Sequence, residues 1–371
     1  MESELFKPDN FSQTDIRYKE FSGNSAVFND VLKLYFNDFK IISIFQLDRP
    51  EINSQNFKII LSVNGKNKEI LLRKYQILSD LSQITFYLDT LSFLGERGVK
   101  VSDVINNLAG QCAIKIGGGV YALFDFIEAD YFSPAKDGAV AVMEEVAKVH
   151  SALRDFDKKQ IAAIDAFSKK AAVYYNEVKL YSEKDFKDIE NIINSKDKND
   201  DDKLVLDKML LIRKTIIEVG EKEKEISFLP KQIIHSDLHP HNVLMVKNEV
   251  GALIDFDAMR LSQRARDMAF AIYRFGRQFL IGIEENEAAS RAPQLTKLFI
   301  GSYNSIDKPA CAGRLSEEEI RLMPILIKDE FLLKILFVLN GIYKKGNYSW
   351  AKDLRKFIAA IEEINYFWPN G

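Results

Sequence analysis

The alternation of apolar and polar positions divides the chain into a strand-rich first third and a helix-rich remainder. Apolar runs of strand length begin near residue 40, and the pair Asn64-Gly65 between two of them is a strong signal for a tight β-hairpin. We therefore expect an antiparallel sheet of three or more strands, followed by a helix over residues 84–97 that ends at Gly98. The strand-like runs cover residues 40–47, 57–63, 68–76, 99–105, 113–116 and 120–127.

Apolar residues three and four positions apart dominate the rest of the chain, and one such helix is also expected near the start. A charged segment over residues 194–203 predicts a mobile loop. One short β insertion, with apolar runs at 243–246 and 252–254, interrupts the helices. This order predicts an α+β fold with two lobes, residues 1–126 and residues 127–371. The expected helices cover residues 25–39, 140–153, 162–181, 204–220, 265–280, 317–321, 325–343 and 350–367.

The β insertion carries the candidate chemistry. Asp237 and Asn242 lie five residues apart across a loop that contains Pro240, and Asp255 follows Asp237 by eighteen residues, at the far end of a predicted hairpin. Such a hairpin would fold Asp255 back next to Asn242. Phosphoryl transfer needs one carboxylate that accepts or orients the proton of the attacking hydroxyl, and carboxylate and amide oxygens that hold Mg²⁺. We interpret this stretch as the catalytic loop and metal-binding segment of a kinase-like phosphotransferase.

The predicted sheet offers candidate contacts for a nucleotide. One cation of the third strand, Arg73 or Lys74, faces the inside of the sheet and could neutralise phosphate charge, although a charge that keeps an edge strand soluble is the alternative. The loop before residue 55 could hold a phosphate through backbone N–H groups and Ser54, or it could be an ordinary turn. Residues 125–127 (Asp-Phe-Ile) would connect the lobes, where backbone groups could meet a flat base.

The central residues resemble a known family. Residues 235–244 (HSDLHPHNVL) look like the catalytic loop of the aminoglycoside phosphotransferase and choline kinase group, which has the pattern H-x-D-x-x-x-x-N. Residues 254–257 (IDFD) resemble the metal-binding segment of the same group. The resemblance implies a bilobal protein-kinase-like fold, with an antiparallel sheet lobe and a larger helical lobe. It also implies that the chain uses ATP and Mg²⁺ to phosphorylate the hydroxyl of a small molecule.

The same resemblance implies roles for single residues. Asp237 would be the catalytic base, with His235 as a structural support of its loop. Asn242 and Asp255 would be ligands of Mg²⁺. We add Asp257 to the candidate metal ligands, although a contact with the substrate or a polar turn would explain it as well.

The resemblance also extends outward along the chain. LLRKY, residues 71–75, is similar to the family's phosphate-contacting strand, which puts the cation at Arg73. Residues 47–57 resemble its nucleotide loop and make Asn53 and Ser54 candidate nucleotide contacts. LFDFI resembles the hinge, so that Asp125, Phe126 and Ile127 would border the base. Residues 266–269 are similar to the helix whose aspartate anchors the catalytic loop, here Asp267.

Two features depart from the family pattern. The loop over residues 47–57 lacks the usual glycines and contains Pro50. Nucleotide affinity could then be modest, or nucleotide binding could rest mainly on the metal and the hinge. The helix after the strand cation offers only Asp89 before Glu96 as an acidic partner, so the residue that pairs with Arg73 stays open.

The composition of the chain argues against several classes of protein. A net charge of −3 gives no general reason to expect nucleic-acid or membrane binding, and 47% apolar with 28% charged residues is typical of a soluble globular protein. Cys112 and Cys311 are too few for a disulfide framework. No apolar run approaches the roughly 18 residues of a membrane span, and the first residues do not resemble a signal peptide. We expect a cytoplasmic protein with a small-molecule substrate.

Two other functions remain open at this point. His235, His239 and His241 cluster beside Asp237, as a metal-dependent hydrolase would require. A kinase fold that binds nucleotide without catalysis is the second alternative. The phosphate acceptor is equally open, because relatives handle aminoglycosides, amino alcohols, homoserine and sugars. The sequence does not indicate an oligomeric state.

Overall fold

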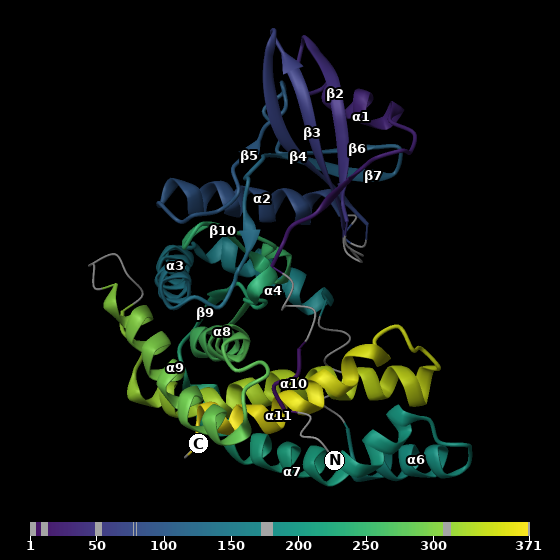
Figure 1. Cartoon of the computed structure of the whole chain (residues 1–371), viewed down its shortest axis with the longest axis vertical. Coiled ribbons are helices and arrows are strands. Elements are labelled where there is room, and N and C mark those ends of the chain that lie inside the picture. The colour runs from purple at the N-terminus through teal and green to yellow at the C-terminus, as the bar shows by residue number, and fades with distance from the viewer. Residues whose placement is uncertain are drawn as a thin grey trace. The chain divides into compact units, whose positions relative to one another are not determined.

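The computed structural model describes residues 5–8, 14–48, 54–76, 78, 80–171, 181–306 and 313–369 (Figure 1). The chain forms two compact units. One, which we call the sheet unit, comprises Gln13–Ala152 and Pro240–Ala258. The other, the helical unit, comprises Met1–Ser12, Leu153–His239 and Met259–Gly371. The lobe boundary expected after residue 126 stays a prediction.

The sheet unit is built on a seven-stranded sheet with the strand order β1-β2-β3-β4-β7-β5, in which β6 also pairs with β7. A second, three-stranded sheet has the order β11-β10-β8. Helices α1 (Ala26–Leu32), α2 (Leu81–Glu96) and α3 (Lys136–Arg154) accompany these sheets (Figure 1). The strands are β1 (Tyr18–Glu20), β2 (Phe39–Leu47), β3 (Ser54–Val63), β4 (Lys66–Tyr75), β5 (Val104–Ile105), β6 (Ala113–Ile116), β7 (Gly119–Asp125), β8 (Asp130–Tyr131), β10 (Val243–Val246) and β11 (Glu249–Leu253).

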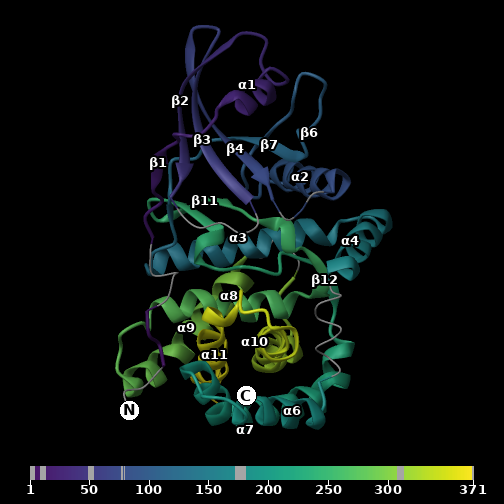
Figure 2. The same ribbon diagram turned by 90° about the vertical axis from the view of Figure 1, so that its right-hand side faces the viewer.

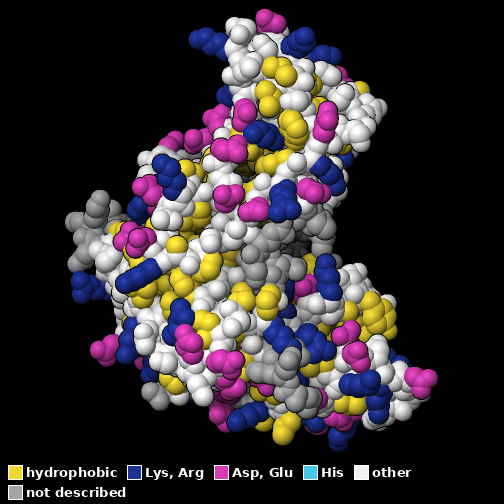
Figure 3. All heavy atoms as spheres, viewed as in Figure 1, with side chains coloured by type: hydrophobic (Ala, Val, Ile, Leu, Met, Phe, Trp, Pro, Cys, Tyr) yellow, Lys and Arg dark blue, Asp and Glu magenta, His cyan; other side chains and the backbone are white. Residues whose placement is uncertain are grey.

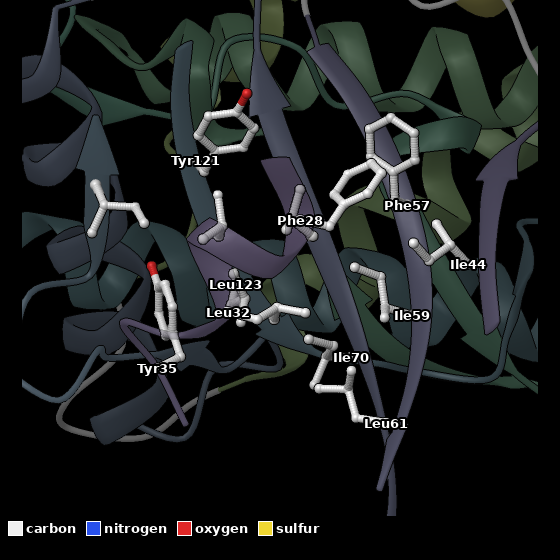
Figure 4. Close-up of a cluster of buried hydrophobic side chains, with 13 residues drawn as sticks. Phe28, Leu32, Tyr35, Ile44, Phe57, Ile59, Leu61, Ile70, Tyr121 and Leu123 are labelled. Carbon is white, nitrogen blue, oxygen red and sulfur yellow. The ribbon is translucent and has the colours of Figure 1, made fainter. Parts of the chain in front are cut away.

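Alternation along the strands builds the core of the sheet unit. On β3 every second residue, at Phe57, Ile59 and Leu61, is buried, and Ile59 pairs with Ile70 of β4. Phe28 of α1 packs against the same face (Figure 4). Each large apolar side chain buried in this way contributes about 1.5–3 kcal/mol. The period of two in the sequence therefore decides which face of the sheet α1 covers.

Local turn chemistry sets the register of this sheet. Asn64 and Gly65 both have positive φ, 49° and 76°, as a two-residue hairpin turn requires. Asp80 then begins α2, because its carboxylate accepts the N–H groups of Ser82 and Gln83. Gly98, with φ of 74°, follows the end of that helix. The predicted hairpin and the predicted end of the helix are both confirmed.

The helical unit is organised around one long helix, α10 (Glu317–Lys345). Helices α7 (Asp200–Phe228), α8 (Arg264–Gln278) and α11 (Leu354–Phe367) pack against it (Figure 2). The two-stranded pair of β9 (Lys231–Ile234) and β12 (Arg260–Gln263) completes the unit beside α8. The other elements are α4 (Lys158–Ala171), α6 (Glu183–Asn194), α9 (Glu285–Ser305), η4 (Ala351–Asp353) and, in the sheet unit, η2 (Pro240–Asn242) and η3 (Phe256–Ala258).

Several predicted elements were wrong in their extent. The helix expected over residues 25–39 ends at Leu32, and of the strand expected over 99–105 only Val104–Ile105 forms. Of the loop expected over residues 194–203, only residues 195–199 lie outside helices, because α6 continues to Asn194 and α7 begins at Asp200. Asn199 caps α7, and acidic residues occupy its first turn, where the helix dipole favours them. Residues 172–180 of the helix expected over 162–181 lie outside the described part of the chain.

The two helices expected on either side of Pro324 are one helix. Pro324 lies inside α10, where proline removes one backbone hydrogen bond. Most of α10 is buried, and packing on several sides outweighs that loss. Helices α6 and α9 and strand β12 were not predicted. None of the helices in the described ranges combines the length and the low polarity that a membrane crossing requires.

Charged side chains of both signs are interspersed on the face shown in Figure 3. Lys and Arg do not gather there in a single basic area. This distribution agrees with the small net charge of −3.

Buried charges join β12 and α8 to α10. Glu330 accepts from Arg260 at 2.7 Å and from Arg266 at 3.3 Å, and Arg266 also contacts Asp329 at 2.7 Å. Burial by itself would raise the pKa of Glu330, but Arg260 and Arg266 hold it at about 2. The Glu330 carboxylate is therefore ionised at neutral pH.

We predict that Glu330→Gln lowers the free energy of unfolding at pH 7 by about 3 kcal/mol or more, because two guanidinium groups lose their buried carboxylate. The folded-state pKa lies below the ordinary 4.5, so this stabilisation is present above pH 4.5 and is lost as the pH falls toward about 2. Urea unfolding of the wild type and of Glu330→Gln, from pH 7 to about pH 4, measures the difference in the free energy of unfolding. The exposed Glu223→Gln on α7 is the matched control, and an equal loss in both variants would contradict the prediction.

Candidate active site

In the helical unit, the candidate catalytic loop begins where β9 ends. Asp267, in the first turn of α8, accepts the backbone N–H of His235 at 2.9 Å and that of Ser236 at 2.8 Å. The backbone of Ser236 has φ of 73°, a left-handed conformation that residues other than glycine rarely adopt. Asp267 is thus the anchor of this loop, as the resemblance of residues 266–269 implied.

Asp237 follows immediately, with a third of its side chain exposed. Its Oδ2 atom lies 3.3 Å from Nε2 of His239, and its backbone N–H donates to Nδ1 of the buried His235 at 3.2 Å. Burial by itself would raise the pKa of Asp237, but His239 and then Lys334 hold it below the ordinary value of a carboxyl group. Asp237 is therefore an accessible, ionised carboxylate at neutral pH.

In the sheet unit, the β10–β11 hairpin brings the predicted metal-binding residues to one end. Val243 pairs with Leu253, and the N–H of Ile254 donates to the backbone oxygen of Asn242 at 3.0 Å. Asn242 ends the short helix η2 before the hairpin, and Asp255 follows the hairpin. The hairpin thus folds residue 254 back against residue 242, as the spacing predicts.

Arg73 of β4 joins this segment through its guanidinium. Its Nη2 atom lies 2.8 Å from Oδ1 of Asp255 and 3.0 Å from Oδ2 of Asp257. Burial would lower the pKa of Arg73, but Asp257 and Asp255 raise it well above its ordinary value. The acidic partners that the sequence left open are therefore these two residues. Asp89 of α2 lies instead against the thiol of Cys112, at 3.6 Å.

The geometry around Arg73 also indicates where a metal ion would fit. Two carboxylate oxygens from Asp255 and Asp257 converge on a single nitrogen atom. Hard oxygen donors that meet at one point are what Mg²⁺ prefers. Asn242 could add an amide oxygen from the same end of the hairpin. The residues present therefore fit a divalent cation.

The predicted nucleotide contacts lie on the same unit. Ser54 is buried at the start of β3, whereas Asn53 lies outside the described residues. Asp125 ends β7 with its carboxylate 3.0 Å from Nζ of Lys68. Lys58 Nζ lies 4.0 Å from the centre of the Phe126 ring, and Ile127 follows as a partly exposed residue. Because the Asp125 and Phe126 side chains have protein partners, backbone groups are the candidates for contact with a base.

The three histidines of the central stretch have different partners. The His235 ring accepts from the backbone of Asp237, and His239 lies against the carboxylate of that residue. The His241 ring packs against Tyr131 in the sheet unit, with ring centres 4.6 Å apart. Within the described residues, no three or more His, Cys, Asp or Glu side chains are arranged to hold a metal. The histidine cluster that a hydrolase would use is thus absent from that part of the chain.

Comparisons with known proteins identify the family. A family model described as the phosphotransferase enzyme family matches residues 51–296. The homoserine kinase of Methylobacillus glycogenes is 25% identical over 292 residues, which cover 76% of this chain and 79% of that protein. These matches confirm the resemblance on which the sequence interpretation rested.

Two solved structures share the fold. A spectinomycin phosphotransferase in complex with ADP and spectinomycin has a TM-score of 0.59 at 12% identity, and the match covers 93% of this chain and 98% of that protein. A microcompartment-associated aminopropanol kinase has a TM-score of 0.57 at 15% identity, and the match covers 94% of this chain and 99% of that protein. The predicted bilobal, protein-kinase-like α+β fold is confirmed.

We predict that Asp267→Asn loosens the catalytic loop. The amide can accept only through its oxygen, so one of the two N–H groups, of His235 or Ser236, loses its acceptor at a cost of about 1–3 kcal/mol. Urea unfolding should show this loss, and hydrogen exchange at residues 235 and 236 should become faster. Asp188→Asn, at an exposed position on α6, is the control, and unchanged exchange in Asp267→Asn would refute the anchoring role.

Proposed function

The chain belongs to the phosphotransferase enzyme family, and from this premise we propose that it is a small-molecule kinase that transfers the γ-phosphate of ATP to a hydroxyl group with the help of Mg²⁺. Family membership identifies it as an ATP-dependent phosphotransferase; the acceptor, the metal ion and the roles of single residues are the proposal. The observation that carries it is the pairing of the strand cation Arg73 with Asp255 and Asp257. Phosphoryl transfer requires such a cation and such carboxylates around the phosphates.

Asp237 is the proposed catalytic base. The acceptor hydroxyl would donate its proton to the Asp237 carboxylate while its oxygen bonds to the γ-phosphorus and the bond to the ADP oxygen breaks. A carboxylate with a lowered pKa is a weak base, but phosphoryl transfer passes through a loose transition state and mainly needs the hydroxyl to be oriented. His239 supports this role, because it holds the carboxylate in its ionised form.

Asn242, Asp255 and Asp257 are the proposed ligands of Mg²⁺, and Arg73 is the proposed phosphate contact. When bound, the cation neutralises phosphate charge as it develops. Asp255 and Asp257 place two carboxylates around the guanidinium of Arg73. Carboxylate oxygens of this kind are ligands that Mg²⁺ prefers. Ser54, with Asn53, and the backbone of residues 125–127 complete the proposed nucleotide contacts.

The proposed acceptor is a small hydroxyl compound that carries an amino group. The homoserine kinase and the aminopropanol kinase named above support this choice, because both names denote a short amino compound with one hydroxyl. A cytoplasmic location, where ATP and such metabolites meet, is part of the same proposal.

We predict that Asp237→Asn lowers kcat by about 10²–10⁴-fold, because the amide cannot accept the hydroxyl proton. ATP-dependent phosphorylation of homoserine and amino alcohols, followed as ADP release, measures the effect. The thermal unfolding temperature should change little, since Asp237 is partly exposed. Asp188→Asn is again the control, and near-normal turnover in Asp237→Asn would exclude it as the base.

We predict separately that Asp255→Ala abolishes Mg²⁺-dependent turnover. The variant should bind Mg²⁺ in the presence of a non-hydrolysable ATP analogue more weakly than the wild type, because a carboxylate ligand is lost. Calorimetric titration of the metal gives this readout without any need for turnover. Full activity of the variant at low Mg²⁺ would remove Asp255 from the metal site.

A further inference from the structure

The outer face of α7 carries the three most exposed large apolar side chains of the described residues. Leu210 and Phe228 are 76% and 77% exposed, and Ile217 is 61% exposed. The three residues follow one another at intervals of 7 and 11 positions. With 3.6 residues per turn, these intervals place them within about 20° of one line along the helix. The partly buried Leu206 extends this line, which we call the α7 stripe.

Packing within the helical unit leaves the α7 stripe uncovered. Helix α7 packs against α6, α10 and α11. Its buried residues Ile212, Thr215 and Ile226 lie on the side of the helix away from the stripe. Figures 1 and 2 both show α7 along one edge of the unit. Single exposed apolar residues are ordinary on a protein surface, but a continuous apolar patch marks an interaction surface.

The α7 stripe has nearly the same pattern when it is read from either end. Leu206 and Phe228 each lie eleven residues from Ile217, and Leu210 and Lys224 each lie seven residues from it. If two copies of α7 packed antiparallel around Ile217, Leu206 would lie against Phe228 of the partner subunit. Leu210 would then lie against the aliphatic stem of the partner's Lys224. Two-fold association of identical chains requires a surface that is self-complementary in this way.

The charges beside the α7 stripe are self-complementary as well. Lys214 and Glu221 are exposed, and within the described part of the chain neither forms an ion pair. They lie on the same flank of the stripe, three residues before and four residues after Ile217. The same flanks of two helices meet in an antiparallel pair. Lys214 of each copy would therefore lie beside Glu221 of the partner subunit.

The opposite flank of the α7 stripe has room for a second helix. Arg213 lies on this flank, 2.9 Å from Glu183 and 3.1 Å from Glu190 of α6. Gly220 lies on the same flank, and a Cβ atom added there would meet nothing within 4 Å. Glycine weakens a helix interior, and packing within the unit does not require it here. In the antiparallel pair, Gly220 would leave space for Arg213 of the partner subunit.

We propose that the α7 stripe is a dimer interface, in which two copies of the chain pack their α7 helices antiparallel around Ile217. A membrane surface fits the stripe less well, because a helix that lies on an anionic membrane has a mainly basic polar face, whereas acidic and basic residues alternate here. One helix from each copy makes the contact, so we expect an interface at the lower end of the roughly 1,200–2,000 Å² of specific complexes. The dimer should therefore dissociate on dilution. This proposal is independent of the proposed function.

Sedimentation velocity of the full chain, from about 1 µM to about 1 mM, tests the proposal. The wild type should change from monomer to dimer with increasing concentration. Ile217→Glu should raise the Kd of the dimer at least about 30-fold, because it places two like charges at the centre of the interface. Its thermal unfolding temperature should change little, since Ile217 is mostly exposed. Leu108→Glu, at a residue of the sheet unit that is 59% exposed, is the matched control and should leave the Kd unchanged.

Reversal of charge tests the antiparallel arrangement. Lys214→Glu and Glu221→Lys should each raise the Kd by about 3- to 10-fold, because each variant replaces two attractive pairs by two repulsive ones. The double variant should return the Kd close to that of the wild type, because both pairs form again with their charges exchanged.

A wild type that stays monomeric over the whole range would overturn the proposal. So would a dimer that Ile217→Glu leaves unchanged, or that Leu108→Glu weakens to the same extent. Binding of vesicles of anionic phospholipid or of a different protein through the α7 stripe, without self-association, would overturn it as well. A double variant that dimerises no better than the single variants would exclude the antiparallel arrangement. If Ile217→Glu does not fold, Ile217→Ser is measured with the same expectation.

Discussion

The carboxylate of Asp267 is the group on which the candidate active site depends most directly. It accepts the N–H groups of His235 and Ser236, and so holds the backbone next to Asp237 in a left-handed conformation. A residue other than glycine pays about 1–3 kcal/mol for such a conformation. Two hydrogen bonds to one charged acceptor offset this cost. Asp267 is itself fixed because α8 packs against α10. The packing of two helices thus determines where the proposed base lies.

Each compact unit carries its own set of buried charges. In the sheet unit, the guanidinium of Arg73 lies against the carboxylates of Asp255 and Asp257. In the helical unit, Glu330 lies against Arg260 and Arg266, and Arg266 also contacts Asp329. Charge pairing lowers the cost of burial in both units.

Local patterns predicted what local chemistry decides, and long-range contacts escaped them. The Asn64-Gly65 turn, the end of α2 just before Gly98 and the hairpin that precedes Asp255 each depend on a few adjacent residues. The partners of Arg73 lie more than 180 positions away, so no spacing could identify them. The break between two helices that was expected at Pro324 was wrong, because the burial of α10 outweighs the low helix propensity of proline.

The central claim is that the chain moves a phosphoryl group from ATP to a hydroxyl and does not merely bind or hydrolyse the nucleotide. Mass spectrometry of the reaction with ATP labelled with ¹⁸O at the γ-phosphate tests it directly. The account predicts an acceptor phosphomonoester that keeps the labelled non-bridging oxygens and carries an unlabelled bridging oxygen from the acceptor, formed together with an equal amount of ADP and abolished by removal of Mg²⁺. Labelled inorganic phosphate, formed with ADP, as the only labelled product would contradict the claim. Tight nucleotide binding without ADP formation in the presence of any tested acceptor would contradict it as well.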